Sequence, residues 1–461
     1  MERRRNASTR GRKDVPGSRA LPVIRANVAG IDIGAQEHFV CAPPGPAGEP
    51  NVRVFGATTG QLEAIADWLK TQGVESVAME STGVYWIALY DLLETRGFEV
   101  VLVNARHLHN VPGRKTDMQD CQWIQLLHSC GLLRGSHRPD EQICALRTLR
   151  RQCANLVEER SKVVQWMQKS LDQMNVRVHR AVSDLMGKTG MEIVRAIVAG
   201  ERDPKGLAQH RDPRCRSSVE EIAEHLRGTW REEHVFTLAM SLRHYDALEE
   251  MIADYEAQIA RRLRALQPPE RRALSAPAHP KPDKHKVMRR HGEEDQRADL
   301  WRLLGADLTR IDGICCATAL TIATEIGPDV STFPDEHHFV SWLRLSPFTP
   351  KSGGKPLRGK KAPKGATYAA SALRMAAATL RHSRSALGAA YRRISRRHGP
   401  GIATFATART LAKLIYRMLR YGHQYVDIGA DAYEERFKRR RLLNLKSNAH
   451  EMGYELVPLA G

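Results

Sequence analysis

The sequence predicts an α/β domain near the N-terminus, a helical middle region and a mainly α-helical C-terminal domain. Short apolar runs alternate with helical patterns as far as residue 138, whereas helical spacing alone governs residues 139–266. Strands that alternate with helices imply a mixed or parallel central sheet covered by helices. The expected boundaries are 1–27 for a disordered basic tail, 28–138 for the α/β domain, 139–266 for the helical region, 267–298 for a charged Pro-rich linker, 299–435 for the C-terminal domain and 436–461 for a basic tail.

Each expected strand of the first domain is a short apolar run bounded by turn residues. The expected helices carry their apolar residues on one face; in QLEAIADWLKTQG, Leu62, Ile65 and Leu69 share a face and Gly73 ends the helix. The expected strands are NVAGIDIG, HFVCAP, NVRVFG, SVAME and FEVVLVN, and the other expected helices are VYWIALYDLLETRG and MQDCQWIQLLHSCG.

Two long apolar stripes at helical spacing occupy residues 140–180 and 238–266. They predict an antiparallel helical hairpin or a coiled-coil arm, with an ordinary helical subdomain as the alternative. Farther along, LTRIDGICCATALTIATEIG predicts a short helix, a turn at Gly313 and a second, apolar helix. A glycine- and lysine-rich loop, TPKSGGKPLRGKKAPKG, and two Ala-rich helices follow.

The charge balance favours a polyanionic partner. The 461 residues carry 71 Lys and Arg against 52 Asp and Glu, a formal net charge of +19. Basic side chains that neutralise phosphates release bound counterions, which favours binding to a nucleic acid. The charge alone does not name the polyanion, because ribosomal and membrane-surface proteins are basic as well. We expect a cytoplasmic protein without a membrane span, because no apolar run reaches ~18 residues and the basic start leads into no signal-type core. The eight cysteines lack C-x-x-C spacing and are expected to be buried small hydrophobic residues.

Four carboxylates lie at chemically informative positions. Asp32 is in a buried-strand pattern, Glu80 ends the SVAME strand, and Asp117 and Asp120 lie three residues apart at a helix start. A pair of divalent ions needs acidic oxygens from several chain segments, and Mg²⁺ prefers carboxylate and phosphate oxygens. Each residue has a plainer alternative: a turn aspartate, a helix-capping glutamate, and a cap formed by Thr116 or Asp117. The order strand, strand end and helix is typical of the ribonuclease-H-like nuclease plan.

Ser352 lies in KSGGK, between Lys351 and the pair Gly353–Gly354. A glycine loop lets backbone amides approach a phosphate, and lysines stabilise its charge. In one interpretation Ser352 only donates a hydrogen bond to phosphate; in the other it attacks phosphorus and holds DNA covalently. The spacing excludes a Walker loop. The expected nucleic-acid-binding residues are Arg114, Lys115, Lys351, Gly353, Gly354, Lys355, Arg358, Lys360, Lys361 and Lys364.

Several motifs follow one another in a specific order: GIDIG, MESTG, the KTDMQD pair and the distal SGGK loop, which is followed by K-G and then L-R. Together they resemble the insertion sequence 110 family of transposases, which includes the pilin-gene invertases. The resemblance covers roughly residues 28–135 and 300–435. It implies a Holliday-junction-resolvase-like ribonuclease H fold with a DEDD metal site, and a C-terminal transposase domain that supplies the nucleophile. It further implies a noncoding guide RNA and a tetramer in which the metal site and the serine come from different protomers. By motif match the catalytic residues are Asp32, Glu80, Asp117, Asp120 and Ser352.

The sequence departs from that family pattern in two places. Segment 175–230 and the linker enlarge the region between the domains, and Ala366 stands where relatives usually have Asn. Neither departure touches the five expected catalytic residues.

The resulting hypothesis is a transposase or site-specific recombinase of a mobile element. It would cut and rejoin donor and target double-stranded DNA through a phosphoserine, with two Mg²⁺ ions, a guide RNA and a homo-oligomer, dimer or tetramer. The alternatives are a junction-resolving nuclease that uses metal-activated water, a site-specific DNA invertase, and a basic nucleic-acid-binding scaffold without activity.

Overall fold

The structure is a computed structural model that describes residues 22–45, 49–81, 83–104, 117–266, 296–347, 351–352, 355–356 and 367–457. The chain divides into two compact units, Met1–His137 and Arg138–Gly461. The expected N-terminal tail lies outside the described residues up to residue 21, and the expected linker lies outside them up to residue 295. The last residues assigned to that linker, 296–298, already form the start of helix α11 (Gln296–Leu304).

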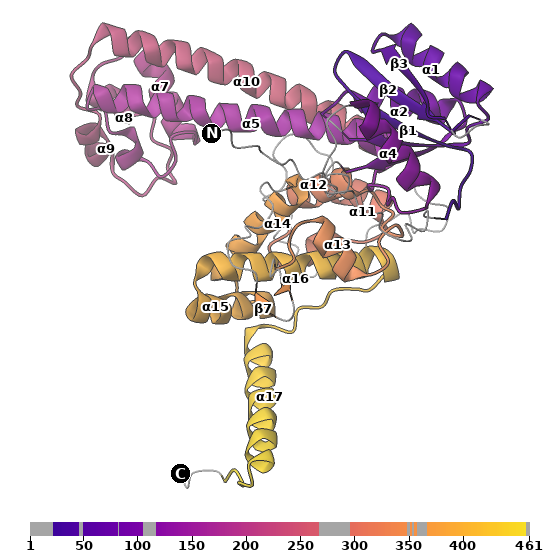
Figure 1. Ribbon diagram of the computed structural model, residues 1–461. Coiled ribbons are helices and arrows are strands. Elements are labelled where there is room, and N and C mark those ends of the chain that lie inside the picture. Colours follow the sequence, from indigo (N-terminus) through magenta and orange to yellow (C-terminus); the bar gives the residue numbers. More distant parts are fainter. Residues whose placement is uncertain are drawn as a thin grey trace, which may run out of the picture. The chain divides into compact units, whose positions relative to one another are not determined.

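The first unit is built on one five-stranded mixed sheet with the order β3-β2-β1-β4-β5 (Figure 1). Strand β2 runs antiparallel to β1 and β3, whereas β4 and β5 run parallel to β1. This confirms the predicted mixed α/β domain. The strands are β1 (Val28–Ile33), β2 (Glu37–Ala42), β3 (Asn51–Gly56), β4 (Ser76–Glu80) and β5 (Glu99–Val103).

Helices cover both faces of this sheet. Helices α1 (Thr59–Thr71) and α2 (Trp86–Thr95) pack on the face that carries Ile31, in a core of buried aliphatic and aromatic side chains. Helix α4 (Asp117–Ser129) packs on the opposite face, where Ala78, Val103 and Ile124 form a smaller core. Since successive strand residues point to opposite faces, Gly30 and Asp32 belong to the α4 side. Each buried aliphatic side chain stabilises the sandwich by about 2 kcal/mol.

Two long helices dominate the first part of the second unit. Helices α5 (Glu141–Gln173) and α10 (Glu232–Ala265) lie side by side (Figure 1). Thr229 N donates to Met174 O at 2.8 Å, which brings the start of α10 to the end of α5 and makes the pair an antiparallel hairpin. Between them lie α6 (Val178–Ala181), α7 (Lys188–Val198), α8 (Pro204–Ala208) and α9 (Val219–His225).

The rest of the second unit is mainly helical. Arg151 of α5 makes two 2.7 Å hydrogen bonds to buried Glu325 of α12, which ties the hairpin to the C-terminal helices. A buried ion pair between Arg297 and Asp307 holds the start of this region. The elements after α11 are η2 (Leu308–Arg310), α12 (Cys316–Ile326), α13 (Glu336–Trp342), β6 (Lys351–Ser352), β7 (Lys355–Pro356), α14 (Tyr368–Thr379), η3 (Leu380–His382), α15 (Ala386–His398), α16 (Pro400–Tyr421) and α17 (Ala430–Glu451).

Two local expectations need correction. Cys315 is exposed, because it is the N-cap residue of α12 and precedes the buried face that starts at Cys316. The segment expected as a basic tail from residue 436 is part of helix α17, since its Arg, Lys and Leu residues are good helix formers. The turn at Gly313 is as predicted: its φ of +88° suits glycine, and η2 and α12 flank it. Among the described helices, none combines the length and the apolar character needed to cross a membrane.

Candidate metal centre and serine hairpin

Gly30 sets how closely α4 approaches the sheet. A Cβ at this position would lie 2.3 Å from the Gln125 backbone nitrogen and 2.4 Å from the Cys121 carbonyl oxygen. Only a residue without a side chain therefore lets α4 lie directly on β1. Two residues farther along the strand, Asp32 points to the same face. The glycine contact thus brings the first turn of α4 next to Asp32.

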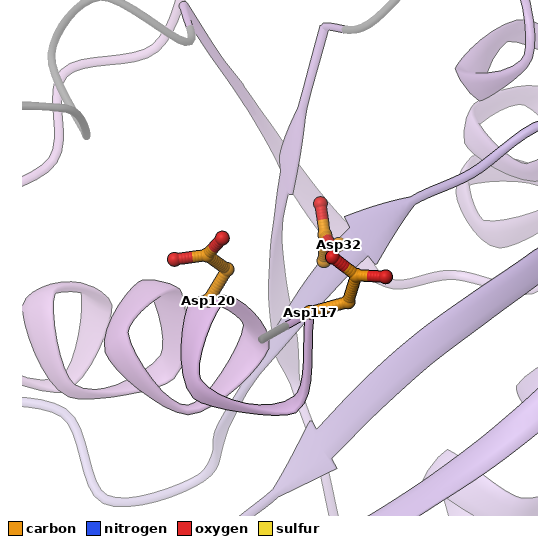
Figure 2. Close-up of side chains that lie close together, drawn as sticks. All are labelled: Asp32, Asp117 and Asp120. Carbon is orange, nitrogen blue, oxygen red and sulfur yellow. The ribbon is translucent and has the colours of Figure 1, made fainter. Parts of the chain in front are cut away.

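Asp32, Asp117 and Asp120 form one carboxylate cluster (Figure 2). One oxygen from each lies within 4.8 Å of the oxygens of the other two, although β1 and α4 are more than 80 residues apart in the sequence. Asp32 and Asp120 are half-buried, and Asp117 is exposed. A helix N-terminus also favours acidic residues in its first turn, so α4 accommodates both aspartates.

Glu80 lies beside this cluster at the end of β4. The parallel register pairs Ile31 with Met79, so that Glu80 is level with Asp32 on the neighbouring strand. Alternation places Glu80 on the same face as buried Ala78, which is the α4 face. Its oxygens are not among those that share the 4.8 Å cluster of the described residues. The residues predicted to form a four-carboxylate site are therefore brought together as a close group of three with the fourth alongside.

The pKa of Asp32 shows how the site concentrates negative charge. Burial and then the charges of Glu80, Asp117 and Asp120 raise this pKa from 3.8 to about 6, against a smaller lowering effect of the Ile33 backbone hydrogen bond. Desolvation and like charges both disfavour an ionised carboxylate. The arrangement is unfavourable for the isolated protein at neutral pH, and a bound cation would relieve it.

The donor set suits a divalent cation. It consists of carboxylate oxygens that remain partly open to solvent, which is the environment that hard cations such as Mg²⁺ and Mn²⁺ occupy in proteins. Among the described residues, this is the only group of three or more acidic, His or Cys side chains close enough to share one ion. The acidic cluster is therefore compatible with divalent-metal use.

Exposed apolar side chains are sequence neighbours of three of the acidic residues. Met118, between the two aspartates of α4, is 46 % exposed, and Val84 and Tyr85, just after Glu80, are 68 % and 49 % exposed. Trp86 holds this turn, because its indole nitrogen donates to Gly83 O at 3.2 Å. The packing role of Gly30 and the exposure of Tyr85 were not predicted from the sequence. Gly30 could have been found from its position two residues before Asp32, whereas the exposure of Tyr85 has no signal in the sequence.

Ser352 lies in a second, local arrangement. Strands β6 and β7 form a two-stranded antiparallel ladder in which Lys351 pairs with Pro356 and Ser352 pairs with Lys355. Gly353 and Gly354 lie between the two strands in the sequence. Ser352 is thus the last strand residue before the connection, and Lys355 is the first residue after it.

The remaining predicted nucleic-acid-binding residues lie outside the described residues. This applies to Arg114 and Lys115 before α4 and to the loop residues Gly353, Gly354, Arg358, Lys360, Lys361 and Lys364. Of the serine loop, the structure gives the backbone pairing of Lys351, Ser352 and Lys355.

Comparison with known proteins gives two family matches. Residues 29–176 match a model described as a transposase and named for the DEDD transposases of IS110, and residues 305–392 match the model of the transposase IS116/IS110/IS902 family. The first match contains all four carboxylates and the second contains Ser352. Together the matches cover about half of the chain. No curated protein matches it.

Proposed function

The chain belongs to the IS110 family of transposases, and from this premise we propose that it cuts and rejoins DNA through a covalent bond to Ser352. As a family member it is a DNA transposase or recombinase, and DNA is its substrate. The observation that carries the proposal is the convergence of Asp32, Asp117 and Asp120 in the first matched segment, in a chain whose second matched segment has a glycine-framed serine.

We assign the first unit to the ribonuclease H-like, Holliday-junction-resolvase-like plan. The sheet order β3-β2-β1-β4-β5, with one antiparallel and one parallel side, supports this assignment. So does the position of the acids, with Asp32 on the central strand, Glu80 at the end of its parallel neighbour and two aspartates on the helix behind them. In this plan the four carboxylates are catalytic because they hold the metal.

Asp32, Glu80, Asp117 and Asp120 would hold two Mg²⁺ ions. When bound, such a pair supplies charge stabilisation at the phosphate and at the attacking and leaving oxygens. The carboxylates themselves provide negative oxygens from a sheet and a helix whose spacing is set by packing at Gly30. These carboxylates would therefore be preorganised for catalysis before DNA binds.

Ser352 is the proposed nucleophile. Its hydroxyl oxygen forms a bond to phosphorus while the bond between phosphorus and one sugar oxygen breaks, and the serine proton is balanced by the proton that the released sugar oxygen takes up. The phosphodiester energy is kept in the phosphoserine, so that a sugar hydroxyl can later attack it and restore Ser352. Lys355, the strand partner of Ser352, and Lys351, its neighbour in the chain, would assist loss of the serine proton and stabilise the phosphate charge.

The proposed partners are donor and target double-stranded DNA, a noncoding guide RNA and further copies of the chain. For the oligomer, the α5–α10 hairpin offers a coiled-coil-like arm whose outer side carries exposed apolar residues. Phe236 and Met240, one turn apart on α10, are 64 % and 42 % exposed, and Trp166 on α5 is 50 % exposed. A tetramer could combine the carboxylates of one protomer with Ser352 of another.

A denaturing gel of the protein with labelled DNA tests this proposal. The wild type should give a slowly migrating covalent band that depends on a divalent cation. Ser352→Ala should give no such band while its affinity for DNA stays within about threefold, because the change removes one hydroxyl group and no charge. A band that persists in Ser352→Ala would remove the serine from the mechanism.

The same gel separates the alternatives. A nuclease that uses activated water would cut DNA in the Ser352→Ala variant without ever forming the covalent band. A scaffold protein would neither cut DNA nor take up a divalent cation at Asp32, which calorimetry on the wild type and Asp32→Asn would show. Mixing Asp32→Asn with Ser352→Ala tests the shared site: recovery of the covalent band requires that different protomers supply the two parts.

A further inference from the structure

Helix α17 is anchored to α15 at its start. The guanidinium of Arg393 lies 3.5 Å from the centre of the Phe437 ring and 4.6 Å from that of Tyr433, and it donates to the Tyr433 hydroxyl. The Ala430 nitrogen also donates to Arg384 O at 3.1 Å. Cation–π contacts of this kind fix the direction in which the helix leaves α15 (Figure 1).

Between Phe437 and the buried Ala449 the helix is exposed on every side. All described residues from Lys438 to Asn448 are exposed, including Leu442, Leu443 and Leu445 at 46 %, 59 % and 45 %. In water an isolated helix shorter than ~12–15 residues is marginal, because packing supplies most helical stability. An exposed stretch of this length with three leucines therefore indicates a surface that a partner covers.

The charge of this stretch identifies the partner. Residues 436–446 contain six cations and no acidic residue: Arg436, Lys438, Arg439, Arg440, Arg441 and Lys446. Four of them, Lys438–Arg441, are consecutive and go around a full helical turn of 3.6 residues. A membrane-binding helix would collect its cations on one face, and a coiled coil would alternate charges of both signs. Cations on all sides instead fit a polyanion that flanks the helix on both sides.

Cations from α15 lie near this stretch. Burial lowers the pKa of the Arg393 guanidinium, the charge of Glu434 raises it, and the charge of Arg440 lowers it by a smaller amount. Arg396 and Arg397, one turn farther along α15, are exposed. The charge of Glu434 thus offsets that of Arg440 at the α15–α17 contact, whereas the exposed Arg396 and Arg397 add positive charge that an anionic partner would neutralise.

We propose that residues 436–448 of α17 lie in the major groove of duplex DNA. That groove is ~12 Å wide and admits an α-helix, whose phosphate-lined walls would face cations on both sides of α17. The exposed leucines would then contact thymine methyl groups, and Asn444 and Asn448, one turn apart, could bond to base edges. Duplex RNA fits less well, because its major groove is deep and too narrow for side chains to read.

This inference rests on DNA as the substrate and not on the phosphoserine step. Failure of the groove-binding proposal and failure of the phosphoserine step can be told apart. If α17 only binds DNA, variants of its cations lose affinity, yet at saturating protein they form as much covalent product per bound DNA as the wild type. If the serine chemistry is wrong, the affinity effects remain and the covalent product is absent from the wild type as well.

The test is a fluorescence anisotropy titration of a labelled DNA duplex with the full-length protein at several salt concentrations. The variant replaces Arg436, Arg439, Arg440 and Arg441 by Gln. We expect the affinity to fall about 100-fold near physiological salt and the slope of log Kd against log salt to decrease by about 3–4, since each lost phosphate contact removes about 0.9. Methylation of guanine N7 reports on the major groove. The bases whose N7 the wild type protects from methylation should lose this protection in the Gln variant.

The matched control replaces the same four residues by Lys. It keeps the charge and should retain the affinity within about threefold, while Gln and Lys have helix propensities similar to Arg, so that circular dichroism should be unchanged in both variants. A second variant, Phe437→Ala, keeps every cation but removes the ring on which Arg393 lies. It should also weaken binding, because the helix would no longer be held in one direction.

Three results would overturn the proposal. One is an unchanged salt slope in the Gln variant with a normal dichroism spectrum. Another is loss of affinity for an RNA duplex but not for the DNA duplex of the same sequence, which would assign the helix to RNA. The third is loss of oligomerisation in the Gln variant, or in Leu442→Ala with Leu443→Ala, without any change in groove protection, which would assign it to a second copy of the chain.

Discussion

The carboxylate cluster and the serine hairpin are assembled in different ways. Asp32, Asp117 and Asp120 come from segments far apart in the sequence and meet because a helix packs directly on a central strand at Gly30. The backbones of Ser352 and Lys355 pair in a two-pair ladder whose two strands lie within six consecutive residues of the sequence, Lys351–Pro356. The first arrangement therefore depends on the packing of a whole unit, whereas the second depends on a local turn. Mutations remote from the chemistry should disable the first far more readily than the second.

The largest expected effect is on the cluster itself. Asp32→Asn should reduce DNA strand cleavage roughly 1000-fold or more, or about 4 kcal/mol of transition-state stabilisation, because it removes a charged ligand from the centre of the metal site. Cleavage assays at saturating divalent cation measure this. The control is Glu63→Gln, an exposed residue of α1 on the opposite face of the sheet, which should leave the rate unchanged. Equal rates for Asp32→Asn and the wild type would show that the cluster does not hold a catalytic ion.

Packing should matter almost as much as the ligands. In Gly30→Ala the added methyl group would collide with the α4 backbone, so that the helix must shift. We expect a loss of about 2–3 kcal/mol in the free energy of unfolding and roughly a 100-fold loss of cleavage, since displacing catalytic groups by about 1 Å is costly.

Gly60→Ala on α1 is the matched control for this prediction. A Cβ at Gly60 would have no heavy atom within 4 Å, so the change should leave cleavage intact and stabilise α1 by up to about 1 kcal/mol. Urea denaturation and cleavage assays of both variants make the comparison. Gly30→Ala with normal activity would mean that close packing of α4 does not position the aspartates.

Glu80 should contribute less than Asp32. Its oxygens lie outside the group that shares the 4.8 Å cluster, although its charge is the strongest of the three carboxylate charges acting on Asp32. Glu80→Gln should therefore lower cleavage by about 10–100-fold and weaken divalent-ion affinity less than Asp32→Asn does, as calorimetric titration would show. A loss as large as that of Asp32→Asn would show that Glu80 contributes as much as Asp32 to holding the ions.

The smallest expected effect is a pH-dependent change in stability. The folded-state pKa of Asp32 is about 6 against 3.8 for the free side chain, so the folded protein binds a proton that the unfolded chain has lost, and stability falls as pH rises through this window. In metal-free protein, Asp32→Asn should thus raise the free energy of unfolding by about 1–2 kcal/mol at pH 8 and by much less at pH 4. A gain that is equal at both values would show that the carboxylate charge is not the cause.

Much of the first unit could be predicted from the sequence, because its strands are short apolar runs and its helices have clear apolar faces. The mixed sheet and the positions of Asp32 on β1 and of Asp117 and Asp120 on α4 agree with that prediction. The sequence could not reveal that three of the acids form a close group while Glu80 lies next to it, because this depends on how closely α4 packs against Gly30. Nor could it show that the basic stretch after residue 435 is a helix held through Arg393, since that contact involves residues 40 positions apart.

If the carboxylates and Ser352 serve one covalent step, the bond to DNA must form on Ser352, and peptide mapping of the protein–DNA adduct by mass spectrometry locates that bond. With divalent cation present, we expect a nucleotide attached to the wild-type peptide that contains Ser352, and no adduct in Asp32→Asn. An adduct on a different residue, or one that forms equally well in Asp32→Asn, would contradict this expectation.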